Sequence, residues 1–194
     1  MAKVLTALLA LVLLTTTPAR ADDEADCRVR GDWPTIVRGC SGVIARTPRE
    51  AWPYINRSWA LERLKRFEEA LADADQALRL DPRAAIAYVN RAAALIGLKR
   101  YDLALEDCES ALQIDSRNVL AYLNRGYAYE QLRRRDLAIE AYRQALALQP
   151  GHAYAQQALT PAPPRPPDLV AADTSPNDER PRPAYARQGR HIKG

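Results

Sequence analysis

The sequence predicts an all-α protein built as a solenoid of stacked helix hairpins. The first observation is a four-residue phrase that returns every 34 residues along this 194-residue chain, as Tyr54-Ile55-Asn56-Arg57, Tyr88-Val89-Asn90-Arg91 and Tyr122-Leu123-Asn124-Arg125. The second is a set of small columns with the same step, such as Ala70, Ala104 and Ala138. The third is that apolar residues within a unit lie three and four apart, as one helical face requires. A fixed period of this length is typical of stacked repeats and not of a domain with one core.

Residues 1–21 are expected to be a secretory signal peptide that is no part of this fold. Lys3 gives a positive start, residues 4–14 are apolar, and Ala19-Arg20-Ala21 forms a small-x-small cleavage site. The apolar run is too short for a bilayer, which takes roughly 20 residues to span. An uncleaved anchor is the alternative. We expect cleavage after Ala21 and a periplasmic location, with an extracellular location as the alternative.

Residues 22–50 are expected to form a disulfide-pinned segment that ends in a half-repeat. Trp33 lies 34 residues before Phe67, so the segment is in phase with the units that follow. Residues 32–46 are therefore predicted to be an unpaired second helix. Such a helix would cover the N-terminal end of the stack, and solenoids need covered ends.

Three cysteines in a chain with an export signal predict one disulfide. Cys40 and Cys108 occupy the same column two units apart, which should be too far for a bridge. We therefore predict a disulfide between Cys27 and Cys40, which would stabilise the fold by roughly 3 kcal/mol in the chain-entropy model. A free, redox-active pair is the alternative. Cys108 is expected to pack as a small buried apolar residue.

Three units follow at residues 51–84, 85–118 and 119–152, each predicted to be two helices joined by a short turn. A basic pair marks each turn, where cations suit the unpaired carbonyl groups that end the first helix. These pairs are Lys65-Arg66, Lys99-Arg100 and Arg133-Arg134. Asp81 is expected to cap the helix that starts the second unit, with Pro82 in its first turn.

The repeated columns resemble the tetratricopeptide repeat family. The resemblance rests on the aromatic residues of the first helices, on large apolar residues further along, on small residues of the second helices and on terminal prolines: Tyr54, Tyr88, Tyr122, Leu61, Leu95, Tyr129, Ala70, Ala104, Ala138, Ala77, Ala111, Ala145, Pro82 and Pro150. Ser58 and Ala92 depart from the family's usual glycine, which only Gly126 keeps. The resemblance covers residues 51–150. It implies a right-handed solenoid of three tetratricopeptide-like hairpins behind an N-terminal half-repeat cap helix.

The C-terminal part changes character. Residues 153–159 are predicted to be a short polar helix that frays. Residues 160–194 hold eight prolines and several arginines, and they cannot bury enough apolar surface to fold, so we expect a disordered Pro/Arg-rich tail. The tail is expected to be solvated; contact with an acidic surface, such as anionic lipid, is the alternative.

In the tetratricopeptide repeat family the first helices line a concave groove, so the resemblance implies a peptide-binding stripe there. The expected residues occupy equivalent positions of the three units: Trp52, Ile55, Asn56, Trp59, Ile86, Val89, Asn90, Ala93, Leu120, Leu123, Asn124 and Tyr127. An asparagine ladder could bond the backbone of an extended peptide, and Trp and Tyr are frequent hot spots. The alternatives are that the stripe packs between units, or that the chain's own tail fills the groove.

The sequence contains two patterns that resemble anion-binding sites, and neither is expected to bind an anion. The column Arg57, Arg91 and Arg125 could bind anions, but pairing with second-helix acids such as Asp73 and Asp107 is the favoured expectation. Chaperone-binding members of the family hold a peptide's terminal carboxylate with Lys, Asn and Arg on successive first helices. Only Asn90 matches that set, so this clamp is not expected.

The sequence offers little support for catalysis, metals or nucleic acid. His152 and His191 are the only two histidines, and neither forms a metal-ligand pair with another. Ser41 and Ser58 have no neighbouring His to activate them. Loss of residues 1–21 would lower the formal net charge from +4 to about +2, which gives no argument for nucleic acid.

We therefore expect a non-catalytic protein-interaction adaptor of a bacterial cell envelope, without cofactor or metal. Its partner would be a protein or peptide, and no transmembrane segment is expected after signal removal. The alternatives are a structural protein that self-associates weakly through its C-terminal repeat, and an envelope-surface binder that acts through its basic tail.

The assigned helix faces can be tested at Ala104, which should lie where two helices approach closely. Replacing Ala104 with Leu should lower the free energy of unfolding by roughly 1–3 kcal/mol, because overpacking forces the helices apart. Urea denaturation measures the change. An unchanged unfolding midpoint would show that the faces are assigned wrongly.

Overall fold

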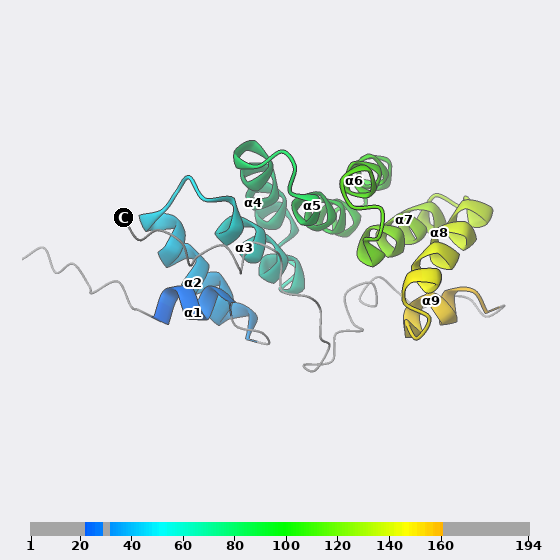
Figure 1. Cartoon of the computed structure of the whole chain (residues 1–194), viewed down its shortest axis with the longest axis horizontal. Coiled ribbons are helices and arrows are strands. Elements are labelled where there is room, and N and C mark those ends of the chain that lie inside the picture. Colours follow the sequence, from blue (N-terminus) through cyan, green and yellow to red (C-terminus); the bar gives the residue numbers. More distant parts are fainter. Residues whose placement is uncertain (1–21, 29–31, 161–194) are drawn as a thin grey trace, which may run out of the picture.

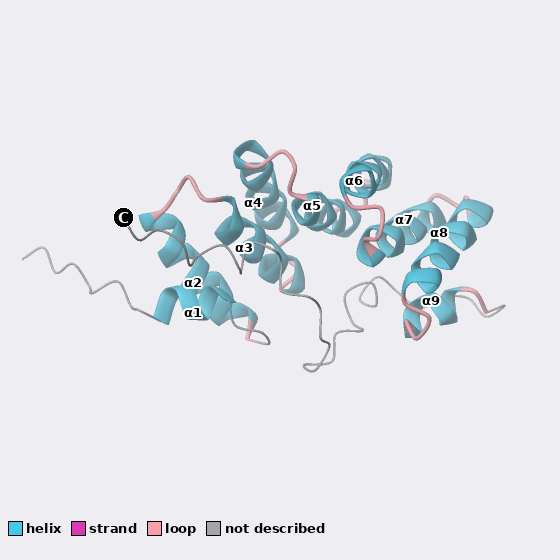
Figure 2. Cartoon of the chain, in the orientation of Figure 1, coloured by secondary structure: helices cyan, strands magenta, loops and turns pink. Residues whose placement is uncertain are grey.

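Stacked antiparallel helix hairpins make up the computed structural model, which describes residues 22–28 and 32–160 (Figure 1). Figure 2 shows helices and loops but no strand in these ranges. The helices are α1 (Asp22–Arg28), α2 (Trp33–Arg46), α3 (Ala51–Arg63), α4 (Phe67–Leu80), α5 (Ala85–Gly97), α6 (Tyr101–Ile114), α7 (Val119–Gln131), α8 (Arg135–Leu148) and α9 (Ala153–Ala158). The predicted all-α solenoid is confirmed. The predicted signal peptide and the tail beyond residue 160 lie outside the described residues.

Each helix packs against its neighbours in the chain, and the first helices α3, α5 and α7 also contact one another in order. The core is therefore a series of small clusters along the stack. The alanine columns lie at the closest approaches; Ala70 and Ala104 are 0% exposed. A methyl group at these positions lets the helices pack to the density of a protein interior.

A small-for-large exchange explains why only one unit keeps the glycine. A Cβ at Gly126 would lie 2.5 Å from the ring of Tyr142 on the facing second helix, so only glycine fits there. In the second unit the equivalent residues are Ala92 and Cys108, and both are buried. Because Cys108 is smaller than tyrosine, the first helix has room for a side chain.

Buried ion pairs join the two helices of units one and two. The Nε and Nη2 of Arg57 donate to both carboxylate oxygens of Asp73, at 2.6 and 2.7 Å. In unit two, the Nε and Nη2 of Arg91 donate to the two carboxylate oxygens of Asp107, at 2.8 and 2.6 Å. The carboxylate raises the pKa of Arg91 above its usual value. The ion-pair expectation is confirmed for these two arginines.

The third member of the arginine column lacks its acid. Ala141 occupies the position that Asp73 and Asp107 hold in the other units. The Arg125 Nε is buried and has no hydrogen-bond partner in the described ranges, and its guanidinium lies 5.0 Å from the centre of the Tyr122 ring. Unit three therefore keeps the cation without the carboxylate.

The basic pair in each turn is locally unfavourable. Lys65, Lys99 and Arg133 have φ of 60°, 60° and 59°, a left-handed conformation that costs a non-glycine residue roughly 1–2 kcal/mol. The arginine that follows each is the N-cap of the next helix and makes no side-chain cap bond. A cation there faces the positive end of the helix dipole. The favourable interaction of a cation with the end of the first helix is therefore expected only for the first residue of each pair. The second residue is an arginine at the unfavourable end of the next helix.

The predicted cap at Asp81 is wrong by three residues. Asp81 ends α4, and its Oδ1 accepts from the backbone N of Arg83 at 3.0 Å. Helix α5 starts after Ala84, which has no capping side chain. The carboxylate therefore stabilises the turn between the two units.

The N-terminal end is a short hairpin and not an unpaired helix. Helix α1 packs on α2, and it approaches so closely at Gly39 that a Cβ there would clash with Asp26. The predicted disulfide between Cys27 and Cys40 is present, with the two Cα atoms 4.5 Å apart. Helix α2 thus has a first helix before it, which the phase of the repeats did not reveal because α1 is shorter than the later first helices, with 7 residues instead of 13, and its link to α2 is longer.

At the other end, α9 covers α8 through a buried apolar face. The rings of Tyr154 and Tyr142 meet edge to face with centres 5.7 Å apart, and their hydroxyl groups lie 3.2 Å apart. Burial raises the pKa of Tyr154 to about 12. The expectation of a polar helix is wrong, because Tyr154, Ala155 and Ala158 are buried.

The unequal arginine column gives a two-way test of stability. Replacing Asp107 with Ala should lower the free energy of unfolding by about 1–3 kcal/mol, since the half-buried Arg91 guanidinium loses both hydrogen bonds to this carboxylate and keeps only its bond to Asp75. Replacing Ala141 with Asp should raise it by about 1 kcal/mol, because the new carboxylate can bond Arg125. Urea denaturation measures both changes.

Ala141→Asn is the matched control, because it adds the same volume without the charge. The interpretation fails if Ala141→Asp is no more stable than Ala141→Asn.

Candidate peptide-binding surface

The twelve residues predicted to bind a peptide lie on α3, α5 and α7, and we call the side of these helices that carries them the first-helix face. The structure divides the twelve into two groups. The half-buried group, which keeps access to solvent, is Trp52, Asn56, Trp59, Ile86, Ala93 and Leu120. The buried group is Ile55, Val89, Asn90, Leu123, Asn124 and Tyr127.

The asparagine ladder bonds the protein itself. Asn90 Nδ2 donates to the backbone oxygen of Ile55 at 2.9 Å and to Ser58 Oγ at 3.0 Å. Asn124 Nδ2 donates to the backbone oxygen of Val89 at 3.3 Å. A buried amide needs such partners, so these donors are not available to the backbone of a ligand. The predicted role of Asn90 and Asn124 in peptide binding is therefore corrected.

The ladder also reaches the N-terminal hairpin. Asn56 Nδ2 donates to the backbone oxygen of Cys27 at 3.1 Å, just as Asn90 donates to the helix before it. Helix α1 therefore occupies the place of a first helix. The asparagine of the first unit was the sequence signal for this helix, because it required an acceptor from a preceding one.

The buried apolar members of the set pack between units. Ile55 belongs to a core cluster with Ala84 and Ala87, and Val89 belongs to one with Ala121. Leu123 and Tyr127 lie in the largest cluster, at the C-terminal end. For these residues the alternative of packing between units holds.

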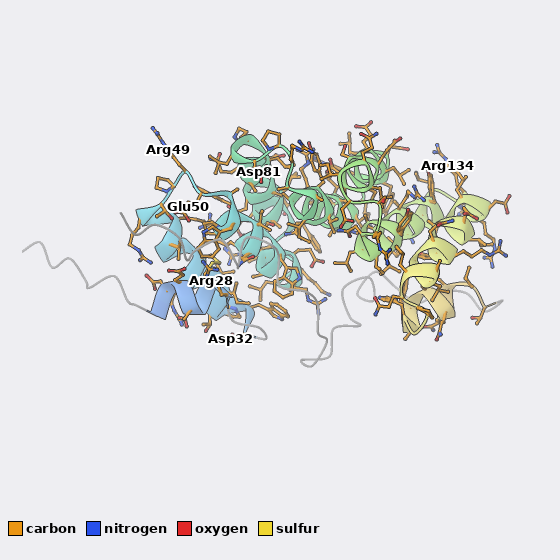
Figure 3. All side chains as sticks on the ribbon, viewed as in Figure 1. Arg28, Asp32, Arg49, Glu50, Asp81 and Arg134 are labelled. Atoms are coloured by element: carbon orange, nitrogen blue, oxygen red, sulfur yellow. A yellow bond between two sulfur atoms is a disulfide. The ribbon has the colours of Figure 1, made fainter. Side chains whose placement is uncertain are left out.

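The two indoles are half covered by the N-terminal hairpin. The Trp59 ring meets the Trp33 ring edge to face with centres 4.8 Å apart. The Arg28 guanidinium lies 4.2 Å from the centre of the Trp52 ring, and Trp52 Nε1 donates to the Glu50 carboxylate. Figure 3 marks Arg28 on α1 and Glu50 on the loop before α3. The indoles are thus held in place and only partly free.

Apart from Asn56, whose amide bonds α1, the accessible residues of the first-helix face form two apolar rows that follow the repeat. One row is Trp52, Ile86 and Leu120, and the other is Trp59 and Ala93. At the N-terminal end, the Arg63 guanidinium lies 5.3 Å from the centre of the Trp33 ring. Apolar contact is therefore what this face offers a ligand over its whole length.

Other site chemistry is limited in the part of the chain that the structure describes. It contains no group of three His, Cys, Asp or Glu residues that could hold a metal ion. Cys108 is buried, and burial raises the pKa of its thiol, which disfavours the reactive thiolate. None of the described helices is both long enough and apolar enough to cross a membrane.

Comparison with known proteins agrees with this geometry. Models described as tetratricopeptide repeat match residues 51–84, 85–118 and 119–152. Stress-induced-phosphoprotein 1 of Caenorhabditis elegans is 40% identical over 52 residues, which are 27% of this chain and 16% of that protein. The chain therefore matches only a small part of that relative's length.

Two solved structures show the same arrangement of helices. The Arabidopsis OM64 TPR domain is 35% identical with a TM-score of 0.54, over 56% of this chain and 89% of that domain. The first TPR of Spaghetti (RPAP3), bound to the HSP90 peptide SRMEEVD, is 25% identical with a TM-score of 0.54, over 56% of this chain and 86% of that one. With its three matched units in register, the chain belongs to the tetratricopeptide repeat family.

Proposed function

We propose that this chain is a non-catalytic adaptor that binds a peptide segment of a partner protein on its first-helix face. Tetratricopeptide repeat proteins bind peptides and mediate protein–protein interactions, and the fold is typically an interaction module. The similar RPAP3 domain was solved with a bound peptide. Binding, rather than chemistry on a substrate, is what these relatives favour.

The observation that carries the proposal is the pair of half-buried apolar rows. Trp52, Ile86 and Leu120 hold the same position in three successive units, and Trp59 and Ala93 hold another. A ligand that covers partly exposed apolar side chains removes apolar surface from water, and this lowers the free energy of the complex. Equal spacing along the stack suits a ligand that presents apolar side chains at regular intervals.

The buried asparagines set the kind of ligand. Because the donors of Asn90 and Asn124 are used inside the protein, the affinity for a peptide comes mainly from apolar contacts. A peptide with apolar anchors fits this face better than one recognised through its backbone or its terminal carboxylate. The partner proposed here is therefore a protein with an apolar segment.

We further propose that the adaptor works in the bacterial cell envelope, in the periplasm. The signal-peptide pattern of residues 1–21 supports this location. The disulfide between Cys27 and Cys40 supports it independently, since disulfides persist in oxidising compartments. Self-association through the C-terminal end is less favoured, because α9 covers α8 there.

Peptide binding can be tested with a displayed library of random short peptides selected on the purified chain. Peptides that it enriches should bind the variant Ile86→Ser/Leu120→Ser at least tenfold more weakly, which is a loss of about 1.4 kcal/mol. Fluorescence anisotropy of a labelled selected peptide measures the affinity. Both residues are half-buried, and circular dichroism shows whether the variant remains folded.

Leu103→Ser/Leu137→Ser is the matched control, because these two leucines are exposed on the second helices. Its affinity for the selected peptides should match that of the parent. If the control loses the peptides and the first-helix variant keeps them, the proposed surface is wrong.

The location has a separate test. After expression in a bacterium, the mature protein should appear in the periplasmic fraction, begin at Asp22 and carry no free thiol at Cys27 or Cys40. Mass spectrometry of the intact and alkylated protein measures both properties. A cytoplasmic chain that keeps residues 1–21 would rule out the proposed location.

A further inference from the structure

A row of exposed cations lies where the two helices of each unit join. We call it the basic edge, and its residues are Lys65, Arg66, Lys99, Arg100, Arg133, Arg134 and Arg135. Four exposed carboxylates lie in the same turns and the helix starts that follow them, namely Glu68, Glu69, Asp102 and Asp136. Seven cations against four anions leave this edge positive.

The backbone conformation of the turns and the capping of the second helices do not favour these residue types. Lys65, Lys99 and Arg133 lie in the left-handed region, where glycine or asparagine is favoured. The arginine after each is an N-cap without a side-chain bond, at a position where Ser, Thr, Asp or Asn is preferred. The same disfavoured residue types occur at these positions in all three units. Such repetition is expected where the residues serve a function.

The edge also exposes apolar side chains in units two and three. Leu103 is 47% exposed and Leu137 is 48% exposed. Each lies four residues after the residue of its unit that has a left-handed backbone conformation, Lys99 or Arg133. Unit one has Glu69 at this position, which pairs with Arg66 at 2.6 Å. Units two and three thus place an exposed leucine beside their turn cations, whereas unit one has at that position an acid that pairs with Arg66.

The two turns lie side by side. Arg134 Nη2 is 4.0 Å from Asp102 Oδ1, and both side chains are more than half exposed. Figure 3 shows Arg134 extending outward from the turn between α7 and α8. The turn of unit three therefore lies beside the start of α6, where the exposed Leu103 follows Asp102 in the chain.

Both the cations and the leucines of the basic edge match the chemistry of an anionic bilayer. Clustered Lys and Arg residues are attracted to anionic lipid head groups. Exposed leucines bury apolar surface when they enter the interfacial layer of the bilayer, which favours binding. An acidic polypeptide would account for the cations but not for the leucines. Single-stranded nucleic acid would call for exposed aromatic rings on which bases can stack, and the exposed large apolar residues of this edge are leucines.

We propose that the basic edge of units two and three binds an anionic membrane surface. Lys99, Arg100, Arg133 and Arg134 contact the lipid phosphates, and Leu103 and Leu137 enter the interfacial layer. This contact uses helix ends, whereas the first-helix face uses helix sides, so it does not depend on peptide binding.

Sedimentation with vesicles tests the proposal, using the chain from Asp22 to Gly194 throughout, so that the apolar run of residues 4–14 is absent and the residues after 160 contribute equally. The chain should bind vesicles of phosphatidylcholine with phosphatidylglycerol more tightly than vesicles of phosphatidylcholine alone. The difference should shrink as salt is added, because exposed charges are screened. Equal binding to both kinds of vesicle would overturn the proposal.

The decisive variant is Lys99→Asn/Arg133→Asn. It should bind the anionic vesicles about tenfold more weakly, since each cation near the surface adds several-fold to the affinity. Its melting temperature should be unchanged or higher, because asparagine tolerates the left-handed conformation. The matched control is Arg83→Asn/Arg117→Asn, which removes two exposed cations at the opposite ends of the helices and should leave the binding within about twofold. An equal loss in the control would overturn the proposed edge.

Two further measurements separate lipid from other polyanions. Leu103→Ser/Leu137→Ser should weaken vesicle binding about tenfold at unchanged charge, because it removes the two inserting side chains. Full retention of binding would overturn the lipid contact. Soluble polyglutamate at matched charge should compete poorly with the vesicles; if it binds the chain as tightly as they do, the partner is an acidic polymer instead.

Discussion

One side-chain amide in each unit sets the register of the stack. In each unit an asparagine of the first helix donates to the backbone of the first helix before it, from Asn56 to Cys27, from Asn90 to Ile55 and from Asn124 to Val89. A buried amide without an acceptor would be costly, so the hairpins can slide past one another only by breaking these bonds. Alanine columns then close the gaps between the helices that the asparagines have aligned. The apolar rows and the basic edge, which both run from unit to unit, follow from this alignment.

The period of the sequence was enough to predict the helices, the three units and the small residues at their contacts. It was also enough to place Cys27 beside Cys40. The first-helix face was predicted with less success, because helical spacing identifies a face without showing what covers it. Ile55, Val89 and Leu123 point toward the neighbouring unit, and only contacts between units could reveal that. Helix α1 was missed for a related reason: its link to α2 breaks the period, although the amide of Asn56 still required a partner.

The structure separates three kinds of surface that the sequence presents as one pattern. The sides of the first helices carry apolar rows, the contacts between units carry the buried amides and alanines, and the turns carry cations. Arg57 and Arg91 lie between these surfaces and are neutralised by Asp73 and Asp107. In the described part of the chain, the turn cations of units two and three form one ion pair, between Arg134 and Asp102. Charge is therefore balanced between the helices of units one and two, and positive charge is in excess at Arg125 and at the turns.

The exchange of size between facing helices also constrains how the repeats can diversify. Gly126 accommodates the Tyr142 ring, while Ala92 faces the smaller Cys108. Recombination between the gene segments of two units preserves the fit when the whole hairpin is exchanged. A crossover inside a hairpin would set the methyl group of Ala92 against a tyrosine ring, or leave a void beside glycine. In this chain the hairpin, and not the single helix, is therefore the smallest unit that can be exchanged without disturbing the packing between its two helices.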